Sequence, residues 1–275
     1  MSTIERYDEA AAHYDRTRVP IGSEVIRDAL RSADRPASEL TLLDAGCGTG
    51  AYSAALAGVP GRLIGLDRSA GMLAAARAKI EGRQGRVGFL RGDLLDLPLA
   101  AASLDAVMFN QVLHHLEDGR DGSYPGHAAA LAEAARVLRP GGRLLLNVCS
   151  HEQLREGFWF YGLIPQALER TLARCAPEHR LRGLLAALGF AVLDRVVPFD
   201  ALLQGEAYFD ARGPLRPEWR RGDSIWALAR PEETRAAVER VKDLERRGEL
   251  DRFMKERDRA RQAVGQVSFF VARRT

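Results

Sequence analysis

The first segment whose residues could bind a ligand is a short apolar run that ends in an acid and a glycine-rich turn. Residues 42–50 read Leu-Leu-Asp-Ala-Gly-Cys-Gly-Thr-Gly, and an alanine-rich segment with helical spacing follows. Glycine lets the backbone turn tightly and approach a ligand closely. In such a strand–turn–helix unit the ligand lies at the carboxyl end of the strand. Asp44 at that end can accept hydrogen bonds from a cationic or amine-bearing ligand, whereas a phosphate would be repelled there.

A second acid closes the next apolar run, Ile-Gly-Leu-Asp at residues 64–67. Asp67 lies 21 residues after Gly46, a spacing that places an acidic side chain against the ribose hydroxyls of a nucleotide. Residues 46–51 also fit the looser dinucleotide pattern G-x-G-x-x-A. An NADP-dependent oxidoreductase, with Arg68 on the 2′-phosphate, is therefore one alternative, but it leaves Asp44 and Asp93 without a role.

Polar residues also follow the third and fourth apolar runs. Asp93 and Leu94 come after the third run, and Asn110, Gln111 and a His-His pair at 114–115 come after the fourth. Asp93 is placed to accept a hydrogen bond from an adenine amino group, and the alternative is that it caps the following turn.

The elements that must position these residues alternate along the chain. Apolar runs lie at 41–45, 62–66, 87–90, 104–109 and 143–148, with helical patterns at 51–57, 70–80 and 128–138 between them. This alternation predicts a parallel sheet with helices on both faces. Further runs at 190–197 and 267–272 predict two more strands. The sequence thus predicts an α/β fold, a Rossmann-like doubly wound sheet of seven strands, whose edge collects the polar residues.

The chain divides into three parts by its patterns. We expect an N-terminal helical lid at 1–40, a cofactor-binding core at 41–150, and the remaining strands with two cap insertions at 151–275. The insertions span about 151–177, with an amphipathic helix at 158–174, and 198–266, with two charged helices within 231–264. A helix at 181–188 should end at Gly189. A segment as long as 198–266 between adjacent strands favours a functional cap over a simple loop.

The ordered array from Tyr7 to Ser150, completed by Val-Leu-Arg-Pro-Gly-Gly-Arg at 137–143, resembles the class I S-adenosylmethionine-dependent methyltransferases. The similarity is to the small-molecule branch related to quinone and natural-product methyltransferases. It implies methyl transfer from S-adenosylmethionine to a small acceptor at oxygen, nitrogen, sulfur or carbon, which leaves S-adenosylhomocysteine.

The resemblance also implies which residues hold the cofactor. Asp67 would bind the ribose, Arg68 and Met72 would flank the adenine, and Asp93 would accept from its amino group. The full set of implied cofactor positions is Tyr14, Arg18, Asp44, Gly46, Cys47, Gly48, Gly50, Asp67, Arg68, Met72, Asp93, Leu94, Asn110 and Gln111. Tyr14 and Arg18 belong to the expected lid.

A general base is needed only if the acceptor arrives protonated. His115 and His114 are the candidates, since histidine titrates near neutrality. Adjacent residues on a helix point about 100° apart, so at most one of the two faces the site, and it serves either as a base or only to shape the pocket. The same geometry argues against joint metal binding, and no other ligand spacing is present, so no metal is expected.

The insertions carry aromatic residues that suit an apolar acceptor. Trp159, Tyr161, Tyr208 and Trp226 are candidate substrate contacts, and the alternative is that they form a small core of the cap. Cys149 and Cys175 would suit arsenite methylation, although a lone cysteine is more often a small buried hydrophobe.

Composition excludes several classes of protein. The chain has 275 residues with 40 Lys+Arg and 37 Asp+Glu, and residues 232–261 hold 9 acidic and 10 basic side chains. Such evenly mixed charge argues against a nucleic-acid surface, and hence against an RNA methyltransferase. Without an apolar run of 18 residues or a signal sequence, and with three scattered cysteines, we expect a cytoplasmic monomer or homodimer that avoids membranes. A non-catalytic cofactor-binding partner protein on the same fold is the remaining alternative.

Overall fold

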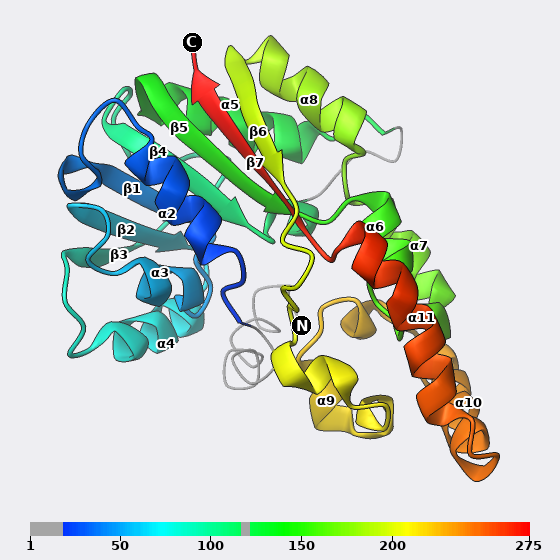
Figure 1. Ribbon diagram of the computed structural model, residues 1–275. Coiled ribbons are helices and arrows are strands. Elements are labelled where there is room, and N and C mark those ends of the chain that lie inside the picture. The colour runs from blue at the N-terminus through cyan, green and yellow to red at the C-terminus, as the bar shows by residue number, and fades with distance from the viewer. Residues whose placement is uncertain (1–18, 117–121) are drawn as a thin grey trace.

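The computed structural model describes residues 19–116 and 122–275, and the seven predicted strands form one sheet in the order β3-β2-β1-β4-β5-β7-β6 (Figure 1). Their bounds are Thr41–Ala45 (β1), Arg62–Asp67 (β2), Val87–Arg91 (β3), Leu104–Asn110 (β4), Leu138–Val148 (β5), Phe190–Val196 (β6) and Ser268–Arg274 (β7). The predicted fold class is therefore confirmed. Strand β5 begins earlier than predicted, because Leu138 already pairs with Leu104.

The strands from β1 to β5 run parallel, and β7 lies antiparallel between β5 and β6. The order runs from β1 through β2 to β3 on one side and through β4 to β5 on the other, so the topology switches between β1 and β4. At that switch Ala45 pairs with both Leu66 and Phe109. Ligands bind outside the carboxyl ends of the strands at such a point.

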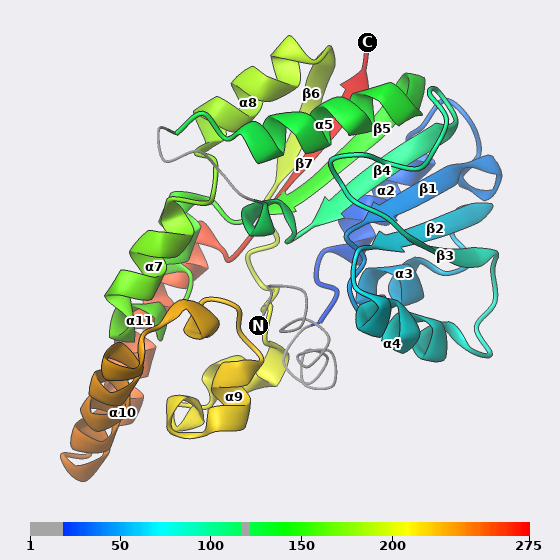
Figure 2. The same cartoon turned by 180° about the vertical axis from the view of Figure 1, so that it is seen from behind.

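Helices cover both faces of the sheet. Figure 1 shows α2 in front of the sheet with α3 and α4 below it, and Figure 2 shows α5 and α8 on the opposite face. Their bounds are Ser23–Arg31 (α2), Ala51–Leu56 (α3), Ala70–Ile80 (α4), Pro125–Val137 (α5) and Glu178–Ala187 (α8). Gly189, with φ 76°, follows α8 as predicted.

The apolar runs fill the core on both sides because successive strand residues point to opposite faces. Leu42, Met108 and Leu145 pack into the cluster under α2 and α3. Leu43 and Phe109 pack into the cluster under α5 and α8. Because both faces of the sheet are buried, the strands stay aligned side by side. The carboxyl ends of the parallel strands therefore form a common edge.

The two insertions fold into one helical cap, whose core continues the cluster under α2. Its helices are His151–Glu156 (α6), Pro165–Leu172 (α7), Pro217–Arg221 (α9), Pro231–Arg246 (α10) and Leu250–Val264 (α11). The two charged helices are confirmed as α10 and α11. The single helix expected at 158–174 is wrong: a 3₁₀ turn at Tyr161–Leu163 precedes α7. Pro165 lacks the backbone N–H that a continuous helix needs and suits only a helix start.

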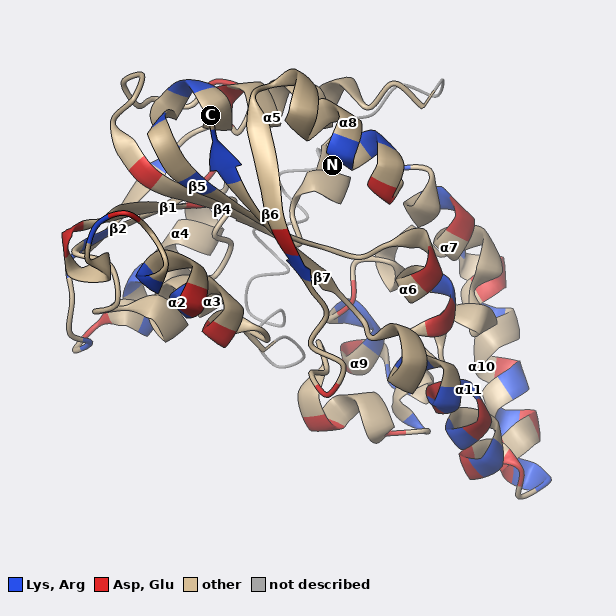
Figure 3. Ribbon diagram, turned by 45° about the horizontal axis from the view of Figure 1, so that its top comes forward, with Lys and Arg blue, Asp and Glu red and all other residues tan. Residues whose placement is uncertain are grey.

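The charged helices carry both signs of charge. Figure 3 shows basic and acidic residues interspersed along α10 and α11, and pairs such as Lys242–Glu239 and Arg246–Asp243 lie within 3.3 Å. These helices therefore show no one-signed face of the kind that nucleic-acid binding needs. Among the described helices, none is both long and apolar enough to cross a bilayer.

Candidate cofactor and acceptor site

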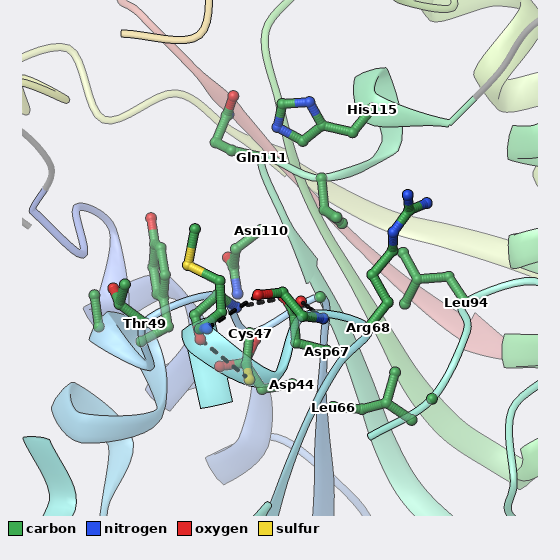
Figure 4. Close-up of a pocket in the computed structure, with 18 of the residues that line it drawn as sticks. Asp44, Cys47, Thr49, Leu66, Asp67, Arg68, Leu94, Asn110, Gln111 and His115 are labelled. Atoms are coloured by element: carbon green, nitrogen blue, oxygen red, sulfur yellow. Dashed lines mark hydrogen bonds between the residues drawn. The ribbon is translucent and has the colours of Figure 1, made fainter. Parts of the chain in front are cut away.

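A cavity opens at the carboxyl edge of the sheet, above the switch between β1 and β4. Its wall combines the glycine turn after β1, the ends of β2 and β4, the loop after β3, and two cap-side residues, Val19 and Leu203. Figure 4 shows Asp44 and Asp67 toward one end of the view and Gln111 and His115 toward the other. The cavity thus has an acidic end and an end near the cap.

The turn at residues 46–50, called the glycine loop below, has a backbone that few other residues could adopt. Gly46, Gly48 and Gly50 have φ values of 76°, 53° and 75°. A Cβ at Gly46 would lie 2.5 Å from Val112, whereas one at Gly48 would meet nothing within 4 Å. Gly48 lines the cavity, so its missing side chain leaves room for a ligand against the backbone.

Asp67 joins the second strand to the glycine loop. Its Oδ2 accepts from the backbone N–H of Gly48 and its Oδ1 accepts from that of Ser69, both over 2.9 Å. The carboxylate is fixed in place, and Asp67 lines the cavity. Two fixed oxygens of this kind suit a pair of ribose hydroxyls.

Asp44 is a buried carboxylate with one oxygen still available. Ser53 donates to its Oδ2 over 2.7 Å, while neither Asp44 Oδ1 nor Asn110 Nδ2 has a hydrogen bond of normal geometry within the described residues. Burial raises the pKa of Asp44 to about 6, although hydrogen bonding from the side chains of Ser53 and Asn110 opposes this. Asp44 and Asn110 lie together at the cavity wall, and a buried carboxylate beside a buried amide suits a ligand with an ammonium group and an acceptor atom.

Cys47 lies in the glycine loop and lines the cavity. Burial raises the pKa of this thiol well above its ordinary range, and the neighbouring carboxylates of Asp44 and Asp67 raise it further. This shift disfavours the thiolate, which is the nucleophilic form of cysteine.

The loop after β3 brings Asp93 and Leu94 to the cavity. Asp93 Oδ1 accepts from the N–H of Leu95 over 3.0 Å, so the turn-capping interpretation is confirmed, and Asp93 also lines the cavity. The loop is anchored to α5, because Glu133 accepts from the N–H of Leu97 over 2.7 Å and Arg136 donates to the Leu97 carbonyl over 2.8 Å.

Apolar residues from outside the glycine loop also line the cavity. Val19, Val112, Leu116 and Leu203 line it together with His115. His115 lies in a 3₁₀ turn at Leu113–His115 and not in the α-helix expected from the sequence. His114 does not line the cavity, which agrees with the prediction that only one of the pair faces it.

Most of the predicted cofactor residues meet at this cavity. Those that line it are Asp44, Gly46, Cys47, Gly48, Asp67, Arg68, Met72, Asp93, Leu94, Asn110 and Gln111, with His115. Gly50 lies behind the loop, where a Cβ would meet Ala76 at 2.9 Å. Tyr14 and Arg18 fall outside the described residues.

The four predicted substrate aromatics are not in the cavity wall. Trp159, Tyr161, Tyr208 and Trp226 are at most 4% exposed and lie in the core of the cap. Trp159 donates to the carbonyl of Tyr208 over 2.7 Å and Tyr161 to Asp223 over 2.9 Å. The structure therefore places them as the cap core, the alternative that the sequence left open.

Sequence reasoning missed several lining residues. Thr49, Ala51, Tyr52, Gly92, Val112 and Leu116 are direct neighbours of the recognised motifs, and that adjacency was a usable signal. Leu203 carried no local signal, because it reaches the cavity from the cap. Its N–H donates to Gln266 Oε1 over 2.7 Å and its carbonyl accepts from the N–H of Val19 over 3.2 Å. Of the suggested thiol pair, Cys149 donates to Gln111 over 3.3 Å and Cys175 is buried after α7.

Comparison with known proteins gives the family. The model of the methyltransferase domain family matches residues 43–146. A demethylmenaquinone methyltransferase from Clavibacter sepedonicus is 36% identical over 143 residues, covering 51% of this chain and 55% of its own length. A Mycolicibacterium smegmatis protein assigned as an S-adenosylmethionine-dependent methyltransferase is 41% identical over 171 residues, covering 62% and 59%.

Residues 43–146 of this chain are a methyltransferase domain. The chain spans little more than half the length of those two relatives. The methyltransferase fold extends further: a solved Anabaena variabilis protein, assigned as a methyltransferase of an antibiotic biosynthesis pathway, superposes with a TM-score of 0.71 at 22% identity. That match covers 94% of this chain and 100% of the other. The likeness therefore includes the cap as well as the sheet.

Proposed function

We propose that this methyltransferase-family protein transfers a methyl group from S-adenosylmethionine to a small acceptor with an apolar body. The observation that carries the proposal is the division of the cavity. Asp44, Asp67 and Asp93 line it from the ends of β1 to β3, while Val112, His115 and Leu116 line it from the segment after β4 and Leu203 from the cap. One part suits the amine-rich and hydroxyl-rich cofactor, and the other suits an apolar acceptor.

The residues present fit the cofactor. Asp44 places a buried carboxylate at the wall for the methionine ammonium, Gly48 leaves space against the backbone, and Asp67 holds two fixed oxygens for the ribose. The bound cofactor supplies an electrophilic methyl group on a sulfonium. These contacts also argue against NADP, whose phosphates would meet carboxylates instead of donors.

The protein's own residues then position the acceptor, exclude water from it and accept its proton. Val112, Leu116 and Leu203 exclude water from the acceptor side, which favours in-line displacement by a held nucleophile. His115 takes the proton of an acceptor that arrives protonated. Because its pKa is raised, the thiol of Cys47 does not compete for the methyl group.

Similarity to a demethylmenaquinone methyltransferase supports a ring-bearing apolar acceptor, with the methylated atom left open among oxygen, nitrogen, sulfur and carbon. We further propose that residues 1–40 act as a lid, 41–150 as the cofactor core, and the insertions in 151–275 as the acceptor cap. The mixed charge of α10 and α11 supports a small molecule over nucleic acid as partner.

We propose a cytoplasmic monomer or homodimer, and the lack of a disulfide among the three described cysteines supports a reducing compartment.

Calorimetry with S-adenosylhomocysteine and with NADP tests the cofactor. We expect micromolar binding of the former and none of the latter, and the reverse result would overturn the proposal. Transfer of labelled methyl from S-adenosylmethionine into organic-extractable products of a cell extract then tests the reaction. Binding without any transfer would favour the non-catalytic partner protein.

A further inference from the structure

A chain of hydrogen bonds crosses the carboxyl edge of the sheet beside the cavity. The Tyr52 hydroxyl donates to the carbonyl of Ile21 over 2.8 Å, and Asn147 Nδ2 donates to that hydroxyl over 2.8 Å. Gln111 Nε2 donates to Asn147 Oδ1 over 2.9 Å, and the Cys149 thiol donates to Gln111 Oε1 over 3.3 Å. These hydrogen bonds join α3, β5 and the segment after β4.

The direction of this chain follows from the chemistry of its first member. A carbonyl can only accept, so the single hydroxyl proton of Tyr52 points to Ile21. The Tyr52 oxygen must then accept from the Asn147 amide nitrogen, which turns Asn147 Oδ1 toward Gln111. Asn147 Oδ1 can only accept, so the amide nitrogen of Gln111 must donate to it. Both side-chain amides therefore have one fixed orientation.

The backbone of Gln111 is held in an uncommon conformation. Its φ is 51°, in the left-handed region, and its N–H donates to the carbonyl of Asn147 over 2.9 Å. A left-handed residue other than glycine costs about 1–2 kcal/mol, and such strain concentrates at functional sites. The turn places the Gln111 amide both against Asn147 and at the cavity wall.

One donor of this fixed amide stays unused. A carboxamide nitrogen has two hydrogens, and in residues 19–116 and 122–275 Gln111 Nε2 has Asn147 as its one acceptor. Neighbouring wall residues such as Val112 and Leu116 are apolar and offer no side-chain acceptor. This oriented N–H is half-buried in a wall that holds both apolar side chains and His115 (Figure 4), and it favours a ligand that brings an oxygen.

We propose that Gln111 binds the acceptor and not the cofactor. Its free amide N–H donates to an oxygen of the acceptor, which is therefore an apolar ring compound bearing a hydroxyl or carbonyl oxygen. This inference rests on the proposed methyltransferase function, because it assigns the part of the cavity beside His115 to the acceptor. Gln111 is then a specificity-determining residue, which Asn147 orients.

A pair of probes that differ by one oxygen tests the proposal. Binding of 2-naphthol and of naphthalene is measured by ligand-observed NMR titration, with and without S-adenosylhomocysteine, in wild type, Gln111→Met and Gln111→Asn. Methionine matches the length of glutamine without a donor. Asparagine tolerates the left-handed backbone but is one methylene too short to reach the same position. Cys149→Ala is the matched control, since it leaves the Gln111 N–H in place.

We expect wild type and Cys149→Ala to bind 2-naphthol about fivefold more tightly than naphthalene, as one neutral hydrogen bond predicts. Both Gln111 variants should lose this preference and keep their affinity for naphthalene and for S-adenosylhomocysteine. Wild type without a preference, or without binding of either probe, overturns the proposal. So does a Gln111 variant that keeps the preference or loses tenfold in S-adenosylhomocysteine affinity. If wild type fails to bind S-adenosylhomocysteine, the proposed function is refuted instead. The preference for 2-naphthol measured without S-adenosylhomocysteine then still tests the role of Gln111.

Discussion

The carboxylate of Asp67 accepts a hydrogen bond from the backbone N–H of Gly48 over 2.9 Å. The end of β2 therefore holds the glycine loop that follows β1. Because Gly48 lines the cavity beside Asp67, the residue proposed to bind the ribose also fixes the loop against which the cofactor would lie.

Asp67→Ala should weaken binding of S-adenosylhomocysteine at least about tenfold, since it removes charge-assisted hydrogen bonds each worth roughly 1.5–3 kcal/mol. The affinity of Asp67→Asn should lie between those of wild type and Asp67→Ala, because its remaining oxygen can still accept from one N–H. Calorimetry measures both, with Asp200→Ala, an exposed carboxylate outside the cavity, as the control. Unchanged affinity in Asp67→Ala would refute the assignment.

The titration of Asp44 should appear in cofactor binding. Burial raises its pKa to about 6, and an ammonium group binds the ionised form. In the protein without ligand, the protonated form is therefore favoured as pH falls through 6. Affinity for S-adenosylhomocysteine should be roughly tenfold weaker at pH 5 than at pH 8. Asp44→Asn should bind weakly at both, and a flat pH profile in wild type would contradict this role for Asp44.

The sequence predicted the acidic part of the site well because its signals are local. Gly46 and Gly48 lie within three residues of the end of β1, and Asp67 is the last residue of β2. Parallel strands bring their carboxyl ends to one edge. No comparable rule places Trp159 or Tyr208, because an apolar aromatic suits a cap core and a substrate wall equally. Only the three-dimensional packing distinguishes these two environments.

Gln111 shows a different limit. Its position at the end of β4 was evident, but its role depends on a left-handed φ and on Asn147 of the neighbouring strand. Neither has a pattern in the sequence, since glutamine carries no marked preference for that conformation. The resemblance therefore placed it with the cofactor residues, whereas the hydrogen-bond chain points to the acceptor.

Gly50 and Gly48 should respond differently to alanine. A Cβ at Gly50 would lie 2.9 Å from Ala76 in α4, so Gly50→Ala combines a left-handed backbone with a clash and should lower the free energy of unfolding by about 2 kcal/mol or more. Gly48→Ala should cost only about 1 kcal/mol but weaken S-adenosylhomocysteine binding at least about tenfold, because its Cβ enters open space at the cavity. Urea unfolding and calorimetry separate the effects, and equal loss of stability in both variants would contradict the model of the loop.

His115 should affect turnover and not cofactor binding. With a protonated acceptor, His115→Ala is expected to lower kcat about a hundredfold, within the range of general-base contributions, and to change S-adenosylhomocysteine affinity less than about twofold. His114→Ala, outside the cavity, is the control and should keep most activity. His115→Gln retains hydrogen bonding without the base, so substantial activity in that variant would show that the residue only shapes the pocket.

Glu133 should stabilise the loop that carries Asp93. It accepts from the N–H of Leu97 over 2.7 Å and pairs with Arg136 at 2.7 Å, and the hydrogen bond from Arg136 lowers the pKa of Glu133 below its ordinary value of 4.5. The ionised form is thus favoured in the folded state, so its contribution is present above about pH 4.5 and is lost as pH falls through the lowered pKa. Glu133→Gln should lower Tm by a few degrees at pH 7 and weaken S-adenosylhomocysteine binding modestly through the loop. The difference in Tm between wild type and variant should shrink steadily below pH 4.5, and a difference that stays constant down to pH 3 would show that the charge of Glu133 does not anchor the loop.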